Sequence, residues 1–110
     1  MSKKIYNKLI RDKIPEVIKE KGGIPEVSIL DGTEFRKSLK IKMTEEAKEL
    51  LEAESNDDVL NELSDVEELV RSIAKNYDLS LDEIEKHRLE KLQKRGGFEK
   101  KLFLKFVKEK

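Results

Sequence analysis

Two long segments of the chain repeat apolar residues with the period of an α-helix, and this pattern constrains the fold more than any other feature. When each residue turns by about 100°, the apolar residues of segment 34–54 fall within about 40° of one line. They are Phe35, Leu39, Met43, Leu50 and Ala53. Segment 58–77 has a second stripe, made of Val59, Leu63, Val66, Val70, Ile73 and Tyr77 with Leu69 beside it. We therefore predict two long amphipathic helices, packed antiparallel because the break between them is short.

Turn and cap signals divide the rest of the chain. A short helix is expected over 12–21, and a fourth helix is expected between the capping box of Ser80 with Glu83 and the Gly96-Gly97 pair. The predicted fold is all-α, a four-helix bundle. Segments 25–30 and 98–107 have strand-like residues, and we expect them to pair as a small two-stranded β element because an isolated short strand is not stable.

Composition sets the size of the core. The chain has 110 residues, of which 36% are hydrophobic and 44% charged, so we expect one domain over 1–110 with a thin core. Absence of Cys excludes a disulfide framework and a thiolate metal site. No stretch approaches the roughly 20 apolar residues of a membrane span, and no signal peptide is visible, so we expect a soluble cytoplasmic protein without a membrane partner.

The net charge of zero hides a strong asymmetry along the chain. Acidic residues concentrate between positions 45 and 68, and basic residues concentrate between positions 86 and 110. A basic tail could bind nucleic acid, but a pI near 6.6 and few aromatic residues are equally consistent with a small ligand that carries phosphate. Charge alone does not choose between these two ligand classes.

Each long helix carries a carboxylate inside its apolar stripe. Glu46 falls at roughly −20° from Leu39, and Glu62 lies within the second stripe. Glu49 and Asp65 follow three residues later at the stripe margins, on the same faces. Four carboxylates that meet in one pocket would repel each other, so a hard divalent cation is expected there. Mg²⁺ or Mn²⁺ suits such a ligand set, whereas zinc usually recruits His or Cys.

Two structural alternatives remain open at this point. Glu-rich helices commonly present solvated faces whose exposed ion pairs contribute about 0.3–0.5 kcal/mol each. A buried ion pair is the other alternative, because Arg88 and Arg95 fall on the apolar side of the fourth helix. Neither alternative requires a metal ion.

The acidic residues occur in a pattern that resembles the MazG-like family. Its mark is Glu-Glu-x-x-Glu followed by Glu-x-x-Asp on the next helix, and here the two motifs are Glu45-Glu46-Ala47-Lys48-Glu49 and Glu62-Leu63-Ser64-Asp65. The segments 6–15 (YNKLIRDKIP) and 94–99 (KRGGFE) are similar to a compact subgroup, the phosphoribosyl-ATP pyrophosphohydrolase-like proteins. Together these segments span nearly the whole chain.

The resemblance implies a Mg²⁺-dependent nucleoside triphosphate pyrophosphohydrolase that hydrolyses the α–β phosphate bond, with a role in cleaning the nucleotide pool. It implies the metal ligands Glu46, Glu49, Glu62 and Asp65, with Glu45 and Glu46 as the catalytic acids and Glu45 positioning water. Homodimers or higher homo-oligomers are expected from the same resemblance. Phosphate binding requires positive charge, and the residues expected to bind the triphosphate are Lys8, Arg11, Lys13, Lys91 and Arg95.

Three other functions compete with this interpretation. The phosphoribosyl-ATP step of histidine biosynthesis shares the acidic motifs and the fold. A di-iron helical protein needs Glu-x-x-His pairs, and the lone His87 has Ile84 three positions before it, which argues against that class. A non-catalytic helical oligomerisation module would use the charge asymmetry to bind a partner, but it gives no reason for Glu46 and Glu62 to lie in apolar stripes.

Overall fold

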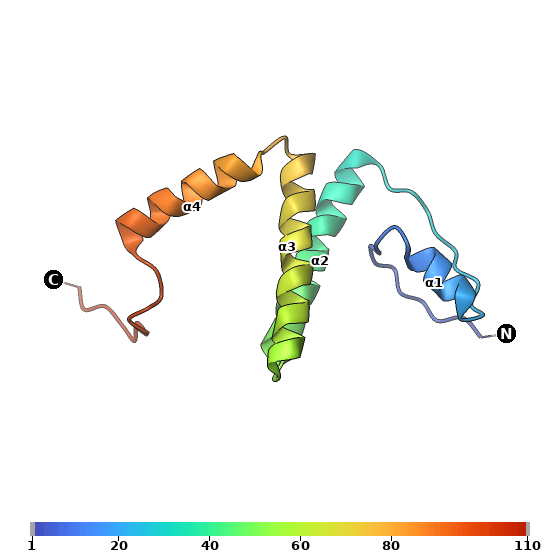
Figure 1. The fold of residues 1–110 in the computed structure, drawn as a ribbon, viewed down its shortest axis with the longest axis horizontal. Helices are drawn as coiled ribbons and strands as arrows, with labels where there is room; N and C mark the ends of the chain where they lie inside the picture. The colour runs from blue at the N-terminus through green and yellow to red at the C-terminus, as the bar shows by residue number, and fades with distance from the viewer. Residues whose placement is uncertain (1, 110) are drawn as a thin grey trace. The chain divides into compact units, whose positions relative to one another are not determined.

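The computed structural model describes residues 2–109, and within this range the chain forms four helices and no strand (Figure 1). The helices are α1 (Ile14–Glu20), α2 (Gly32–Glu52), α3 (Asn56–Asn76) and α4 (Leu81–Arg95). The all-α prediction is confirmed. The chain divides into two compact units, Met1–Asp78 and Leu79–Lys110. None of the helices within 2–109 has the length and apolar character needed to cross a membrane.

The predicted two-stranded β element is wrong, because neither 25–30 nor 98–107 forms a strand in the described part of the chain. Ile29 is fully exposed and Phe98 is 98% exposed, so these segments do not bury an apolar face. Strand-like composition stabilises a sheet only through cross-strand contacts and burial. Without a neighbouring strand, both segments remain irregular.

Side-chain caps explain where the long helices begin. The Asp31 carboxylate accepts a hydrogen bond from the Glu34 backbone N–H at 2.8 Å, and Ser55 Oγ accepts one from the Asp58 N–H at 3.1 Å. Because the residue after an N-cap is already helical, α2 and α3 each begin two residues earlier than the predicted starts at 34 and 58. The capping box of Ser80 with Glu83 is present at the start of α4, as predicted.

The packed part of the first unit is a hairpin of α2 and α3, which lie side by side and run antiparallel (Figure 1). Its apolar core is small: Leu39, Leu69 and Ala74 are the buried hydrophobic residues within 2–109. Glu46 is the buried charged residue of the same range, at 7% exposure. A carboxyl group therefore occupies one of the most protected positions of the hairpin.

Candidate metal centre

Three carboxylates from the two hairpin helices meet in one cluster. Glu46 and Glu49 come from α2, Glu62 comes from α3, and one oxygen of each lies within 4.8 Å of those of the other two. Glu46 and Glu49 share a face because they are three residues apart on a helix. Antiparallel packing of α3 then brings Glu62 to the same place. This group of three acidic residues could hold a metal ion.

Burial distinguishes two members of the cluster from a solvated acidic surface: Glu46 is buried and Glu62 is half-buried, whereas Glu49 is exposed. Glu46 Oε2 and Glu62 Oε2 are both buried, and neither has a hydrogen-bond partner among the described residues. Buried polar atoms in proteins are nearly always paired, because an unpaired buried group loses its hydration without compensation. The solvated-surface alternative is therefore wrong for Glu46, and both orphaned oxygens fit the requirement of a hard cation for oxygen ligands.

The cluster also changes the acidity of its central residue. The pKa of Glu46 is raised from 4.5 to about 7, first by burial and then by the neighbouring side chains of Glu62 and Glu49 and the negative charge of Asp65. Loss of hydration and like charges both disfavour the ionised carboxylate. A bound divalent cation would favour the ionised form instead.

Asp65, the fourth predicted ligand, has a different partner. Its Oδ1 accepts a hydrogen bond from Arg11 Nη2 at 2.7 Å, and the two side chains form an ion pair. Asp65 is not part of the group of three carboxylates. The structure thus brings together three of the four predicted ligands and pairs the fourth with a predicted phosphate-binding residue.

An open groove of about 590 Å³ begins at the cluster, within the first unit. The charged residues that line the groove are the acidic Asp12, Glu46, Asp65 and Glu68 and the basic Arg11, Lys42 and Lys75. Apolar residues complete the wall, among them Leu9, Phe35, Leu39 and Leu69. Ligand sites in proteins commonly combine an apolar wall with a few convergent polar groups. The groove therefore combines acidic, basic and apolar groups around one open space.

Lys42 is a residue of the site that was not predicted from the sequence. Lys42 Nζ lies 3.8 Å from Glu45 Oε2 and 4.0 Å from Glu46 Oε1, and its side chain is only 18% exposed. The helical turn that selected Glu46 also places Lys42 at about −60° from Leu39, at the stripe margin. This position at the stripe margin is the sequence feature from which the inward orientation of Lys42 could have been predicted. Lys75 and Phe35 of the groove were likewise not assigned to a site.

The remaining predicted site residues lie elsewhere. Lys8 and Lys13 are exposed and are not among the residues that line the groove. Lys91 and Arg95 belong to α4, in the second unit, where both are exposed. Arg88, one partner considered for a buried ion pair, instead pairs with Glu85 on its own helix.

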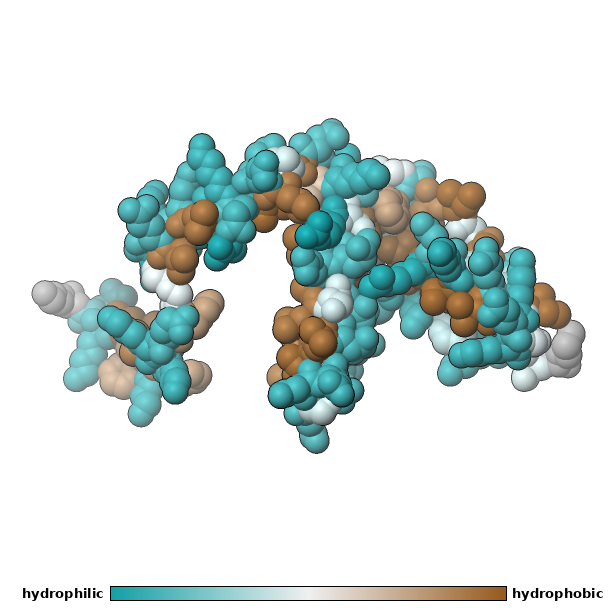
Figure 2. All heavy atoms as spheres, in the orientation of Figure 1, coloured by the Kyte–Doolittle hydropathy of each residue, from teal (hydrophilic) through white to brown (hydrophobic). Residues whose placement is uncertain are grey.

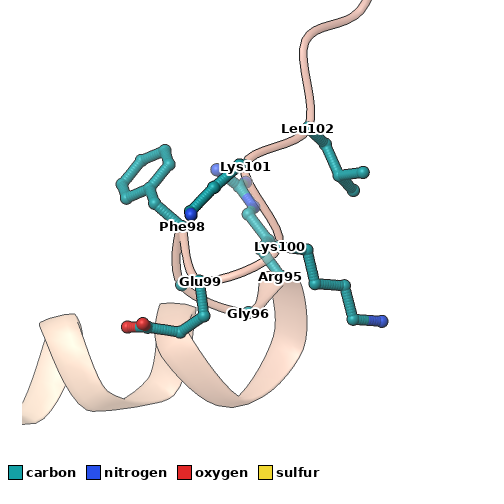
Figure 3. Close-up of a pocket in the computed structure, with 8 residues that line it drawn as sticks. Arg95, Gly96, Phe98, Glu99, Lys100, Lys101 and Leu102 are labelled. Atoms are coloured by element: carbon teal, nitrogen blue, oxygen red, sulfur yellow. The ribbon is translucent and has the colours of Figure 1, made fainter.

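Arg95 lines a pocket of about 370 Å³ in the second unit, together with residues 96–102 (Figure 3). Gly96 ends α4 with φ +79°, and its N–H donates to the Leu92 carbonyl at 2.8 Å. A left-handed residue after the last helical turn favours glycine. In Figure 3 the chain folds back after α4, and the Glu99 and Lys100 side chains point to opposite sides. Gly96 therefore acts as a helix terminator.

Comparison of the chain with protein-family models, with curated proteins and with solved structures gives no match. The description of the site consequently depends on its own geometry. That geometry defines a helical hairpin with an acidic cluster able to hold a metal ion, beside a groove with basic and apolar walls.

Proposed function

We propose that the protein is a Mg²⁺-dependent nucleoside triphosphate pyrophosphohydrolase that releases a nucleoside monophosphate and pyrophosphate. The observation that carries this proposal is the pair of buried, unpartnered oxygens of Glu46 and Glu62, in a carboxylate cluster next to a groove with basic residues. The motif resemblance described above points to the same reaction.

The residues of the cluster suit the proposed cation. Glu46, Glu49 and Glu62 would hold it through carboxylate oxygens, and Asp65 is the fourth ligand that the resemblance implies. An all-oxygen ligand set fits Mg²⁺, with Mn²⁺ as the other hard cation of this kind. When bound, the cation would neutralise phosphate charge and lower the pKa of water.

Residues beside the cluster and in the groove have distinct roles in the proposed reaction. Water attacks the α phosphorus in line, the bond from this phosphorus to the bridging oxygen breaks, and pyrophosphate leaves with the bond electrons. Glu45, a half-buried carboxylate next to the cluster, is the group that we assign to accept the proton of the attacking water. Arg11 and Lys75 provide positive charge for the polyphosphate.

The test is a screen for pyrophosphate release. Wild-type protein is incubated with Mg²⁺ and a panel of canonical and damaged nucleoside triphosphates, with phosphoribosyl-ATP included as a further substrate. We expect turnover with at least one nucleoside triphosphate. Glu46→Gln and Glu62→Gln should each lower kcat by about 100-fold or more, since they remove charge that holds the cation.

Glu52→Gln is the matched control, because Glu52 is an exposed acid on the same helix. It should retain wild-type activity. Equal activity in the wild type, Glu46→Gln and Glu62→Gln would refute the proposed site even if turnover were observed.

A further inference from the structure

Lys42 is held close to the acidic cluster without forming a hydrogen bond to it. The distances from Lys42 Nζ to the oxygens of Glu45 and Glu46 are 3.8 and 4.0 Å, and both exceed the roughly 2.7–3.2 Å of an N–H···O hydrogen bond. An ammonium group has three N–H donors and no acceptor. The Lys42 side chain is only 18% exposed, so its ammonium group has limited access to water. Lys42 is also among the residues that line the groove.

Along α2, Lys42 lies between the carboxylate end of the groove and its apolar wall. Lys42 lies one helical turn before Glu46, a rise of about 6 Å, and one turn after Leu39, a rise of about 4.5 Å. All three residues line the groove. A ligand whose anionic end reaches the carboxylate cluster and whose organic end contacts the apolar wall therefore passes the Lys42 ammonium.

A cation on the carboxylate cluster would leave Lys42 available to a phosphate acceptor. Glu45 and Glu46 are its two acidic neighbours within 4.0 Å. A divalent cation on the cluster would share the charge of Glu46 and weaken the attraction of this carboxylate for Lys42. A lysine ammonium group is a compact positive charge, and it donates short, charge-assisted hydrogen bonds to phosphate oxygens.

We propose that Lys42 is a substrate-binding residue that holds the pyrophosphate part of the nucleotide beside the carboxylate cluster. The proposal rests on the proposed function and adds to it the residue that fixes the leaving group. The competing explanation is that Lys42 serves only as a counter-ion for Glu45 and Glu46.

Binding of inorganic pyrophosphate with Mg²⁺, measured by calorimetry, tests the proposal without turnover and without a choice of base. Lys42→Gln should weaken pyrophosphate binding by roughly 10- to 100-fold, the effect of losing one charge-assisted hydrogen bond. Lys42→Arg should restore part of this affinity, because it keeps the charge. Lys48→Gln, which changes an exposed lysine of the same helix outside the groove, should bind like the wild type.

A second measurement separates phosphate binding from a counter-ion role. The increase in melting temperature caused by Mg²⁺ alone should persist in Lys42→Gln, and circular dichroism should show its helices intact. The proposal is overturned if Lys42→Gln binds pyrophosphate like the wild type, if the wild type does not bind it, or if Lys42→Gln also loses the effect of Mg²⁺. Absence of turnover with every nucleotide would remove the proposed function, while these binding data would still decide the role of Lys42.

Discussion

Glu46 is a carboxylic acid at a buried position of the hairpin. The residue is 7% exposed, lies in the apolar stripe of α2, and has one buried carboxylate oxygen without a partner among the described residues. Burial and the nearby carboxylates raise the pKa of Glu46 to about 7, so in the absence of a cation the group is partly protonated at neutral pH. The surroundings of Glu46 in the hairpin therefore destabilise its ionised carboxylate. Strongly shifted pKa values of this kind are typical of functional sites.

A dependence of stability on pH follows at this residue. Because the pKa of Glu46 is raised from 4.5 to about 7 on folding, its protonated form contributes stability that is complete below pH 4.5 and is lost as the pH rises through about 7. The loss is on the order of 3 kcal/mol, at about 1.4 kcal/mol per pKa unit. We expect Glu46→Gln to lack this component in urea unfolding at a series of pH values without divalent ions.

Glu52→Gln serves as the control for the pH series and should follow the wild-type curve. The informative quantity is the difference in the free energy of unfolding between wild type and Glu46→Gln, which should widen as the pH rises. Parallel curves for these two proteins would show that Glu46 does not titrate in this window.

Metal binding is expected to offset the loss of stability that ionisation of Glu46 causes. At neutral pH, Mg²⁺ or Mn²⁺ should raise the melting temperature of the wild-type protein, because a ligand that binds only the folded state stabilises it. Removal of the ion with EDTA should return the original value. Glu46→Gln and Glu62→Gln should lose most of this shift, whereas Glu67→Gln, at an exposed acid of α3, should keep it. An equal shift in all four proteins would argue against a specific site.

At the scale of elements, the α2–α3 hairpin supplies the site and the N-terminal segment closes one side of the groove. Leu9, Arg11 and Asp12 line the groove together with residues of both hairpin helices. The ion pair of Arg11 with Asp65 joins residues 54 positions apart, whereas the other ion pairs within residues 2–109 link neighbours on one helix. Arg11 thus anchors the segment to α3.

Removal of this anchor should loosen the N-terminal segment. Arg11→Gln is expected to speed amide hydrogen exchange in residues 8–13, by about two- to fivefold for an exposed pair worth at most about 1 kcal/mol. Exchange in α2 and α3 should stay unchanged. Arg71→Gln, which breaks a pair with Glu67 within α3, should leave residues 8–13 unaffected. Unchanged exchange in Arg11→Gln would mean that other contacts hold the segment.

At the scale of the whole molecule, much apolar surface is left exposed. Leu51, Leu60 and Leu63 of the hairpin are 85%, 65% and 49% exposed, and Figure 2 shows apolar side chains on the surface of this hairpin. Small domains with thin cores commonly gain stability by self-association. The homo-oligomer expected from the sequence would cover such surface, and this expectation stays a prediction.

Sedimentation measurements test this prediction. The wild-type protein should sediment as a dimer or larger assembly at micromolar concentration, and the double variant Leu51→Ser with Leu60→Ser should dissociate, since a fully buried Leu contributes about 1.5–3 kcal/mol. Asn61→Ser, at a neighbouring exposed position, should assemble like the wild type. A wild-type protein that remains monomeric at all concentrations would contradict the expectation.

The sequence by itself determined the helices and the location of the carboxylates. Apolar periodicity is a local property of a helix, so it predicted α2 and α3 to within two residues at their starts and placed Glu46 and Glu62 on inward faces. Caps at Asp31, Ser55 and Ser80 are likewise local, because each involves a backbone N–H three residues later.

Only the tertiary structure decided which of these residues meet. The pairing of Asp65 with Arg11, the meeting of Glu62 with Glu46 and Glu49, and the absence of a strand pair within residues 2–109 depend on contacts between segments far apart in the chain. Such contacts depend on how helices pack and on what covers a side chain, and the helical period does not specify them. The period predicts the face on which a carboxylate lies, and packing decides its neighbour.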